Sequence, residues 1–154
     1  IALSIQAGKG YRINVAAPTG IKMPAILMES KVAVTPMQGF TRFSGTMEIA
    51  GINNAIRMNR VQAIAQASSQ YYQGIAITKE DQEQAHCGLR PLSPDGLPFI
   101  GRHSSCSNLV MATGHAMMGW SLGPGTGKLV SEIISGKKTA MDITAFAPER
   151  KYGL

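Results

Sequence analysis

Glycine and proline concentrate in two neighbouring segments of this sequence, and these segments constrain its fold more than any other feature. The first is the string G-L-R-P-L-S-P-D-G-L-P-F-I-G at residues 88–101. The second is A-T-G-H at 112–115, followed by a glycine-rich stretch at 119–127. Glycine permits positive φ values and close backbone approach to a flat ligand, while proline fixes turns. The two segments predict a shaped loop surface that holds a ligand; a set of ordinary surface turns is the alternative.

The first half of the chain predicts an antiparallel sheet with a covering helix. Alternation predicts a strand at 11–17, and further short strands are expected at 25–28, 31–35, 40–43 and 46–48, with turns at residues such as Gly39 and Gly45. Asn53 is a candidate cap for a helix that runs through Ala55 to Ala65, where apolar residues recur every three or four positions. With 44% hydrophobic residues in 154, the chain can bury a real core.

Residues 88–136 resemble the carboxyl-terminal segment of the FAD-dependent D-amino-acid oxidase and dehydrogenase (DAO) family, and most of all its bacterial D-amino acid dehydrogenases. The resemblance rests on the strings G-L-R-P-x-(S/T)-P-D-G-x-P-x-I-G and (A/T)-T-G-H-x-x-x-G-W, with weaker support from G-K-G-Y at 8–11 and G-T-M-E-I-A-G at 45–51. Members of the family open with a Rossmann unit whose G-x-G-x-x-G turn binds the FAD pyrophosphate. This sequence has no such opening, so we expect a carboxyl-terminal portion of a longer flavoenzyme that is inactive in isolation.

The expected fold class is therefore α+β. We expect an antiparallel substrate-binding domain at 1–80, and the last strands and helix of a Rossmann-like FAD domain, without its amino-terminal half, at 81–154. Strands are predicted at 85–91 and 108–113, and a final helix is predicted to stop at Gly136. Propensity starts that helix near 124–128, whereas the resemblance starts it near Gly119; repeated glycines that allow close packing favour the earlier start.

The resemblance also implies the site residues. Arg90 matches the arginine that pairs with the substrate carboxylate, which a guanidinium grips through two parallel hydrogen bonds. His115 is expected as a pocket-wall or positioning residue, with a purely structural histidine as the alternative, and Trp120 is either part of the flavin site or simple core. The residues expected to contact FAD are Gly88, Gly101, Gly114, His115, Met117, Met118, Gly119 and Trp120.

The implied reaction is hydride transfer from the α-carbon of a D-amino acid to the flavin, followed by hydrolysis of the imino acid to a 2-oxo acid and ammonia. Electrons then pass to a quinone or another acceptor. A glycine- or sarcosine-type amine oxidase is the alternative within the family, because G-P-G-T-G at 123–127 resembles amine and glycine oxidases as much as the dehydrogenases. A non-catalytic binding or assembly module is the alternative of another class.

The remaining partner predictions come from charge and composition. A net charge of +6 invites a nucleic-acid interpretation, but the charges are scattered and aromatic residues are few, so no nucleic acid is expected. The resembled dehydrogenases lie on the cytoplasmic side of the bacterial inner membrane, and the basic groups at 137–138 and 150–151 predict a peripheral contact there. No membrane-spanning helix is expected. An uncovered sheet edge would favour homo-oligomers.

Metal binding is not expected. A zinc site is the alternative, because two histidines and two cysteines could supply four tetrahedral ligands: His86, Cys87, His103 and Cys106. However, adjacent residues on a strand point to opposite faces, which makes His86 and Cys87 a poor clamp. The two cysteines have no disulfide-like spacing, which fits a reducing compartment.

Overall fold

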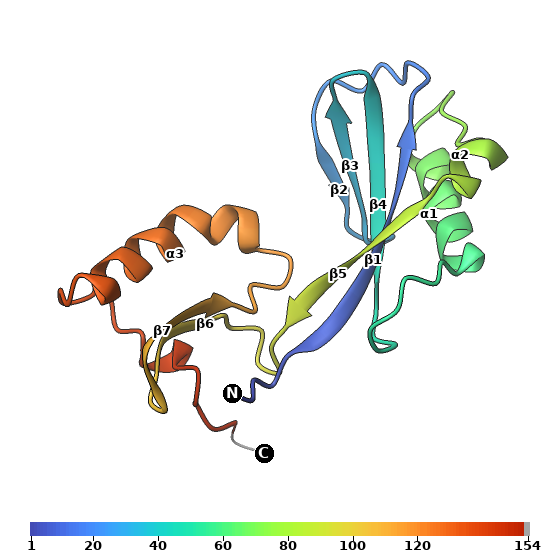
Figure 1. Ribbon diagram of the computed structural model, residues 1–154. Helices are drawn as coiled ribbons and strands as arrows, with labels where there is room; N and C mark the ends of the chain where they lie inside the picture. Colours follow the sequence, from blue (N-terminus) through green and yellow to red (C-terminus); the bar gives the residue numbers. More distant parts are fainter. Residues whose placement is uncertain (153–154) are drawn as a thin grey trace. The chain divides into compact units, whose positions relative to one another are not determined.

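The computed structural model describes residues 1–152, which form two compact units (Figure 1). The sheet unit comprises residues 9–89, and the hairpin unit comprises residues 1–8 and 90–152. The chain passes between the units at 8/9 and at 89/90, so residues 81–89 belong with the sheet unit rather than with the segment that follows. The roles that the sequence assigns to the two parts stay predictions.

The sheet unit is built on five strands in the order β2-β3-β4-β1-β5. The pairs β1–β4, β2–β3 and β3–β4 are antiparallel, as is β6–β7 in the hairpin unit, which confirms the α+β class. The strands are β1 (Gln6–Val15), β2 (Ala25–Leu27), β3 (Val32–Met37), β4 (Phe40–Glu48) and β5 (His86–Leu92). The first strand pairs with β4 rather than with the strand that follows it in the chain.

One strand replaces two that the sequence predicts separately. The sequence placed a turn at Gly45 between strands at 40–43 and 46–48, and this was wrong because β4 is continuous. A β-bulge interrupts its pairing with β1 instead: Tyr11 pairs with Gly45 and Lys9 with Glu48, so β4 contains one extra residue. Thr46 at this point has φ 71°, an uncommon value for a β-branched residue.

Alternation gives the sheet two different faces. One face carries the core, which is made of buried side chains from β1 to β4 and from α1 (Met58–Tyr71), among them Tyr11, Ile13, Val34, Phe43 and Ile64. Gly45 lets the helix approach closely, since a Cβ there would lie 3.1 Å from the Ile64 side chain. The other face, which is not covered by α1, carries half-buried polar residues such as Arg12 and Arg42.

The start of α1 differs from the prediction. Arg57 is its N-cap, and Asn53 lies four residues earlier, where its side chain accepts a hydrogen bond from the Ala55 amide in a local turn. Asparagine favours such turns as strongly as it favours caps, which explains the error. A short helix, α2 (Lys79–Glu83), was not predicted; Thr78 and Asp81 form a capping box at its start.

The hairpin unit consists of β6 (Phe99–His103), β7 (Cys106–Thr113), helix α3 (Gly119–Ile134) and a single 3₁₀ turn at Thr144–Phe146. The sequence missed β6, which begins within the glycine- and proline-rich string at 88–101. The early start of the final helix at Gly119 is confirmed, and Gly136 has φ 66° just after its end. Helix α3 packs against both strands of the hairpin (Figure 1).

Candidate functional site

The hairpin unit contains most of the predicted site residues. Arg90 lies near the end of β5, and the loop between β7 and α3 contains the glycine, histidine and methionine residues expected at the flavin. The predicted site residues that lie in this unit are Arg90, Gly101, Gly114, His115, Met117, Met118, Gly119 and Trp120. Gly88 belongs to the sheet unit, where a Cβ would meet no atom within 4 Å.

Backbone contacts hold the end of β5 against the β7–α3 loop. Leu92 and His115 form an antiparallel bridge, and the Ala116 amide donates a hydrogen bond of 3.2 Å to the Pro91 carbonyl. Arg90 therefore lies two residues from the point where its strand meets the glycine loop. Its side chain is half-buried and, within residues 1–152, makes no ion pair. The Arg90 guanidinium is therefore available to pair with a ligand carboxylate near this loop.

The loop has a conformation that constrains its residues. Gly114 has φ 81°, and a Cβ there would lie 3.0 Å from the buried Phe99 ring, so glycine is needed both for φ and for space. Ala116 has φ 49°, which is uncommon for a residue with a side chain. Strained positions of this kind cluster at ligand sites, and the loop leads directly into α3.

His115 is held in place by the helix that follows it. Its Nε2 lies 2.9 Å from Thr126 Oγ1 in the second turn of α3. A ring nitrogen engaged with a hydroxyl is less available to take a proton from a substrate, so this contact favours a positioning role over a general base. Thr126 was not predicted from the sequence, although its place within the glycine-rich stretch at 119–127 was an available signal.

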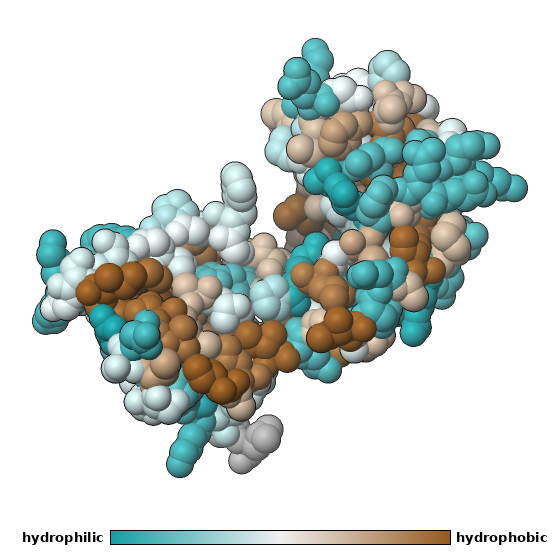
Figure 2. Space-filling view, viewed as in Figure 1, coloured by the Kyte–Doolittle hydropathy of each residue, from teal (hydrophilic) through white to brown (hydrophobic). Residues whose placement is uncertain are grey.

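A cavity of about 610 Å³ lies beside His115 within the hairpin unit. Its walls are mainly apolar and come from the 96–100 segment, α3 and the 140–146 segment. The residues that line it include Leu97, Ile100, His115, Met118, Leu129 and Phe146. Figure 2 shows apolar surface over the part of the molecule that contains α3, β6 and β7. A cavity of this size and character matches small-molecule sites in general.

The amino-terminal half of α3 is open. Among residues 1–152, no side chain caps its first turn, and Met118 serves as the N-cap residue. Added Cβ atoms at Gly123, Gly125 and Gly127 would meet nothing within 4 Å, and Trp120 is 96% exposed. The interpretation of Trp120 as simple core is therefore wrong for the described chain. The free amides and the positive end of the helix suit an anionic group, and the glycines leave room for a flat ligand.

Arg150 secures the turn before β6. It forms two 2.8 Å contacts with the Asp95 carboxylate, donates to the Leu97 carbonyl at 2.7 Å, and stacks on Phe99 with 4.0 Å to the ring centroid. Hydrogen bonds from Arg150 hold the pKa of Asp95 far below its usual range. Asp95 also forms a turn with its own backbone, because its carboxylate accepts a hydrogen bond from the Leu97 amide. Arg150 is thus a structural clamp and not a free member of the expected basic tail.

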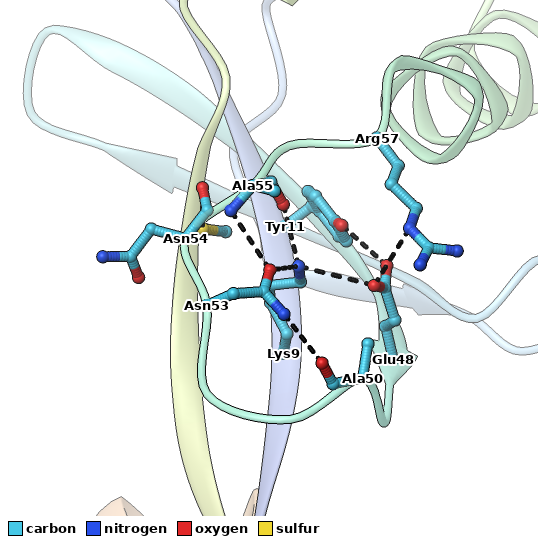
Figure 3. Close-up of polar contacts among 9 residues, drawn as sticks. Lys9, Tyr11, Glu48, Ala50, Asn53, Asn54, Ala55 and Arg57 are labelled. Atoms are coloured by element: carbon cyan, nitrogen blue, oxygen red, sulfur yellow. Dashed lines mark hydrogen bonds and ion pairs between the residues drawn. The ribbon is translucent and has the colours of Figure 1, made fainter.

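A buried polar cluster in the sheet unit was not predicted (Figure 3). Lys9 is 1% exposed and Glu48 5% exposed, and Lys9 Nζ lies 3.4 Å from Glu48 Oε1. Tyr11 donates a 2.7 Å hydrogen bond to the other carboxylate oxygen, while Arg57 Nε lies 3.2 Å from Oε1. The Tyr11 hydrogen bond, with contributions from Lys9 and Arg57, lowers the pKa of Glu48. The G-K-G-Y string was the signal, since it placed a lysine inside a buried strand.

The residues on which the metal and membrane predictions depend all lie within residues 1–152. Cys87 contacts the Asn54 carbonyl, and Cys106 contacts Asn108; both thiols are free. His103 Nδ1 lies 3.3 Å from Glu149. Across residues 1–152, no three metal-ligating side chains come together. No helix in that same span has the length and apolar character needed to cross a bilayer.

Comparison with protein families identifies the lineage of the sequence. Residues 2–133 match the family described as FAD dependent oxidoreductase (DAO). The sequence is 34% identical over 145 residues to D-amino acid dehydrogenase 1 of Mesorhizobium japonicum, covering 92% of this chain and 34% of that protein. It is also 34% identical over 155 residues to D-amino acid dehydrogenase of Agrobacterium fabrum, covering 97% of this chain and 36% of that protein. The chain spans about a third of the length of these relatives.

Solved structures show the same fold. Glycine oxidase from Geobacillus kaustophilus superimposes with a TM-score of 0.82 at 24% identity, covering 99% of this chain and 41% of that one. L-proline dehydrogenase from P. horikoshii gives a TM-score of 0.76 at 16% identity, with 96% and 40% coverage.

Proposed function

Because the chain belongs to the DAO family of FAD-dependent oxidoreductases, we propose that it forms the substrate-binding and flavin-contacting part of a D-amino acid dehydrogenase. The observation that carries the proposal is the similarity to proteins of that name over nearly the whole chain. The match covers about a third of those proteins, so the catalytic activity is assigned to a longer protein that includes this chain. The 154 residues alone are expected to be inactive.

The residues of the hairpin unit fit a flavin. FAD, when bound, supplies the acceptor for two electrons and the α-hydrogen of the substrate. The open first turn of α3 provides backbone N–H groups for negative charge on such a ligand, and the glycines of the helix leave space for a ring system. The constrained loop at Gly114 fixes where those amides lie.

Substrate orientation is assigned to Arg90. A guanidinium fixes a carboxylate through two parallel hydrogen bonds, which aligns the α-carbon without any proton transfer by the protein. Arg90 suits this task because it is half-buried and lies on a strand bonded to the glycine loop. His115, held by Thr126, shapes the wall of the adjacent cavity.

The electron acceptor is assigned to a quinone or another carrier, because the curated relatives are named dehydrogenases. The glycine oxidase likeness does not change this assignment, since at 24% identity it concerns the fold. Oxygen uptake and quinone-analogue reduction, measured side by side with D-alanine, separate the two. Fast oxygen uptake without quinone reduction would reject the assignment.

Two experiments test the proposed function. The visible spectrum of the purified chain, after incubation with FAD and gel filtration, shows whether the hairpin unit retains flavin without further chain. In the longer protein, Arg90→Ala should raise KM for a D-amino acid far more than Arg60→Ala, a matched change at an exposed position of α1. An unchanged KM in Arg90→Ala would remove the carboxylate assignment.

A further inference from the structure

One edge of the sheet in the sheet unit is open. Strand β2 lies at the end of the strand order, and within residues 1–152 it pairs with β3 alone (Figure 1). The backbone N–H and C=O groups on its other side therefore have no strand partner in that part of the chain. Such an edge is a template for a further strand, and proteins commonly protect it with a charged side chain in the strand. The three residues of β2 are alanine, isoleucine and leucine, so this protection is missing.

The side chains along this edge are apolar and exposed. Met23 is 76% exposed, Ile26 is 68% exposed and Met28 is 61% exposed. Leu27 is buried in the core, so the neighbouring Ile26 lies on the face of the sheet that α1 leaves uncovered. Apolar side chains gathered at an open edge leave water when a second strand is added beside them, and this favours association.

Charges of opposite sign flank the strand. Lys22 precedes β2 and Glu29 follows it; both are exposed, and neither belongs to an ion pair within residues 1–152. Glu29 accepts a 3.2 Å hydrogen bond from the Tyr71 hydroxyl, which holds it at this edge. In an antiparallel pair of identical strands, the start of each strand lies beside the end of the other. Lys22 of each copy then lies near Glu29 of the other, so the charges of the edge complement those of a second copy.

We infer that the β2 edge binds the β2 edge of a second copy of this chain, so that two sheets join around a two-fold axis. An axis at Ile26 keeps each face of the joined sheet uniform, because directly opposite residues share a face. Ile26 then contacts its counterpart on the uncovered face, while Ala25 lies opposite Leu27 of the other copy on the core face. Because the strand has only three residues, the interface is small and the dimer is weak, forming at high chain concentration.

The oligomeric state of the whole chain tests the inference without flavin or substrate. Sedimentation velocity over a range of chain concentrations should show a monomer–dimer equilibrium. Ile26→Lys places two like charges opposite each other at the axis and should weaken dimerisation by roughly tenfold or more. Ile52→Lys, the same change at another exposed isoleucine of the sheet unit, should leave dimerisation unchanged. A monomer at every concentration, or self-association that Ile26→Lys does not reduce, would overturn the inference.

Exchange of the flanking charges tests the antiparallel orientation. Lys22→Glu alone, or Glu29→Lys alone, brings like charges together twice in each dimer and should weaken dimerisation by about threefold to tenfold. The double variant restores opposite charges and leaves the net charge of the chain unchanged, so it should recover most of the loss. An equimolar mixture of the two single variants should also dimerise more strongly than either variant alone. A loss in the double variant as large as the two single losses combined would overturn the antiparallel pairing of two copies.

Discussion

Replacing Lys9 by methionine should destabilise the sheet unit strongly. Lys9 Nζ donates hydrogen bonds of 2.7 Å to Asn53 Oδ1 and 2.8 Å to the Ala55 carbonyl, and it lies 3.4 Å from Glu48 Oε1. Methionine keeps an unbranched apolar side chain that is one atom shorter, and it removes the charge and all three contacts. The Glu48 carboxylate then stays in the core with one cation fewer to balance it.

The expected loss follows from the burial of Lys9. Removing one partner of a buried ion pair costs about 3–5 kcal/mol, because the other charge is left uncompensated. The two hydrogen bonds to the ammonium, at about 1.5–3 kcal/mol each, give a similar total. For a chain of this length the change lowers Tm by roughly 6–20 °C.

Urea unfolding followed by far-ultraviolet circular dichroism measures the effect, and hydrogen exchange locates it in β1, β4 and the 50–57 loop. Lys22→Met is the matched control, since Lys22 is exposed in the same unit. The double variant Lys9→Met with Glu48→Leu should recover part of the loss, because it leaves no unpaired charge in the core. A loss below about 1 kcal/mol for Lys9→Met, similar to that of the control, would refute the argument.

Three further predictions concern backbone strain and acid. Thr46→Gly should raise the free energy of unfolding by roughly 0.5–1 kcal/mol, because relief of the positive φ exceeds the entropy cost of glycine; a loss in urea unfolding would contradict this. Gly114→Ala should cost about 2 kcal/mol or more through φ and contact with Phe99, and should exceed Gly96→Ala, which has similar φ and open space. Because its arginine partner lowers the folded-state pKa of Asp95, that pair stabilises the fold above about pH 4 and the stabilisation is lost as pH falls further. In an acid titration, Asp95→Asn should lose less free energy of unfolding below about pH 4 than the unsubstituted chain, because it lacks this titrating carboxylate.

Local sequence signals were sufficient to predict an element of the fold where one strong pattern was present. The β7 strand and the glycine stop of α3 were predictable, because an apolar segment ends at Gly114 and Gly136 follows the apolar face of the helix. The turn at Asp95 was predictable for the same reason, since an aspartate before glycine bonds its own backbone. The start of α3 at Gly119 came from the family resemblance, since propensity alone placed it near 124–128.

The errors share a different cause. Asn53 and Gly45 each suit two kinds of local structure, and contacts with distant residues determine which one forms. Lys9 binds the Asn53 side chain, and the close packing of α1 requires Gly45 within a strand. The contacts of Lys9 with Glu48 and of Arg42 with Asn14 also join residues that are far apart in the sequence. No local pattern encodes which residues face each other across a sheet.

The extra residue at Thr46 connects the two polar features of the sheet. A one-residue shift of register moves every later side chain of a strand to the opposite face. Without the bulge, Met47 would face Lys9 in the core, and Glu48 would lie on the same face as Arg12 and Arg42. The bulge therefore places the acid with the buried lysine and keeps it away from the arginines. Thr46, with its uncommon positive φ, lies at the bulge that makes this separation.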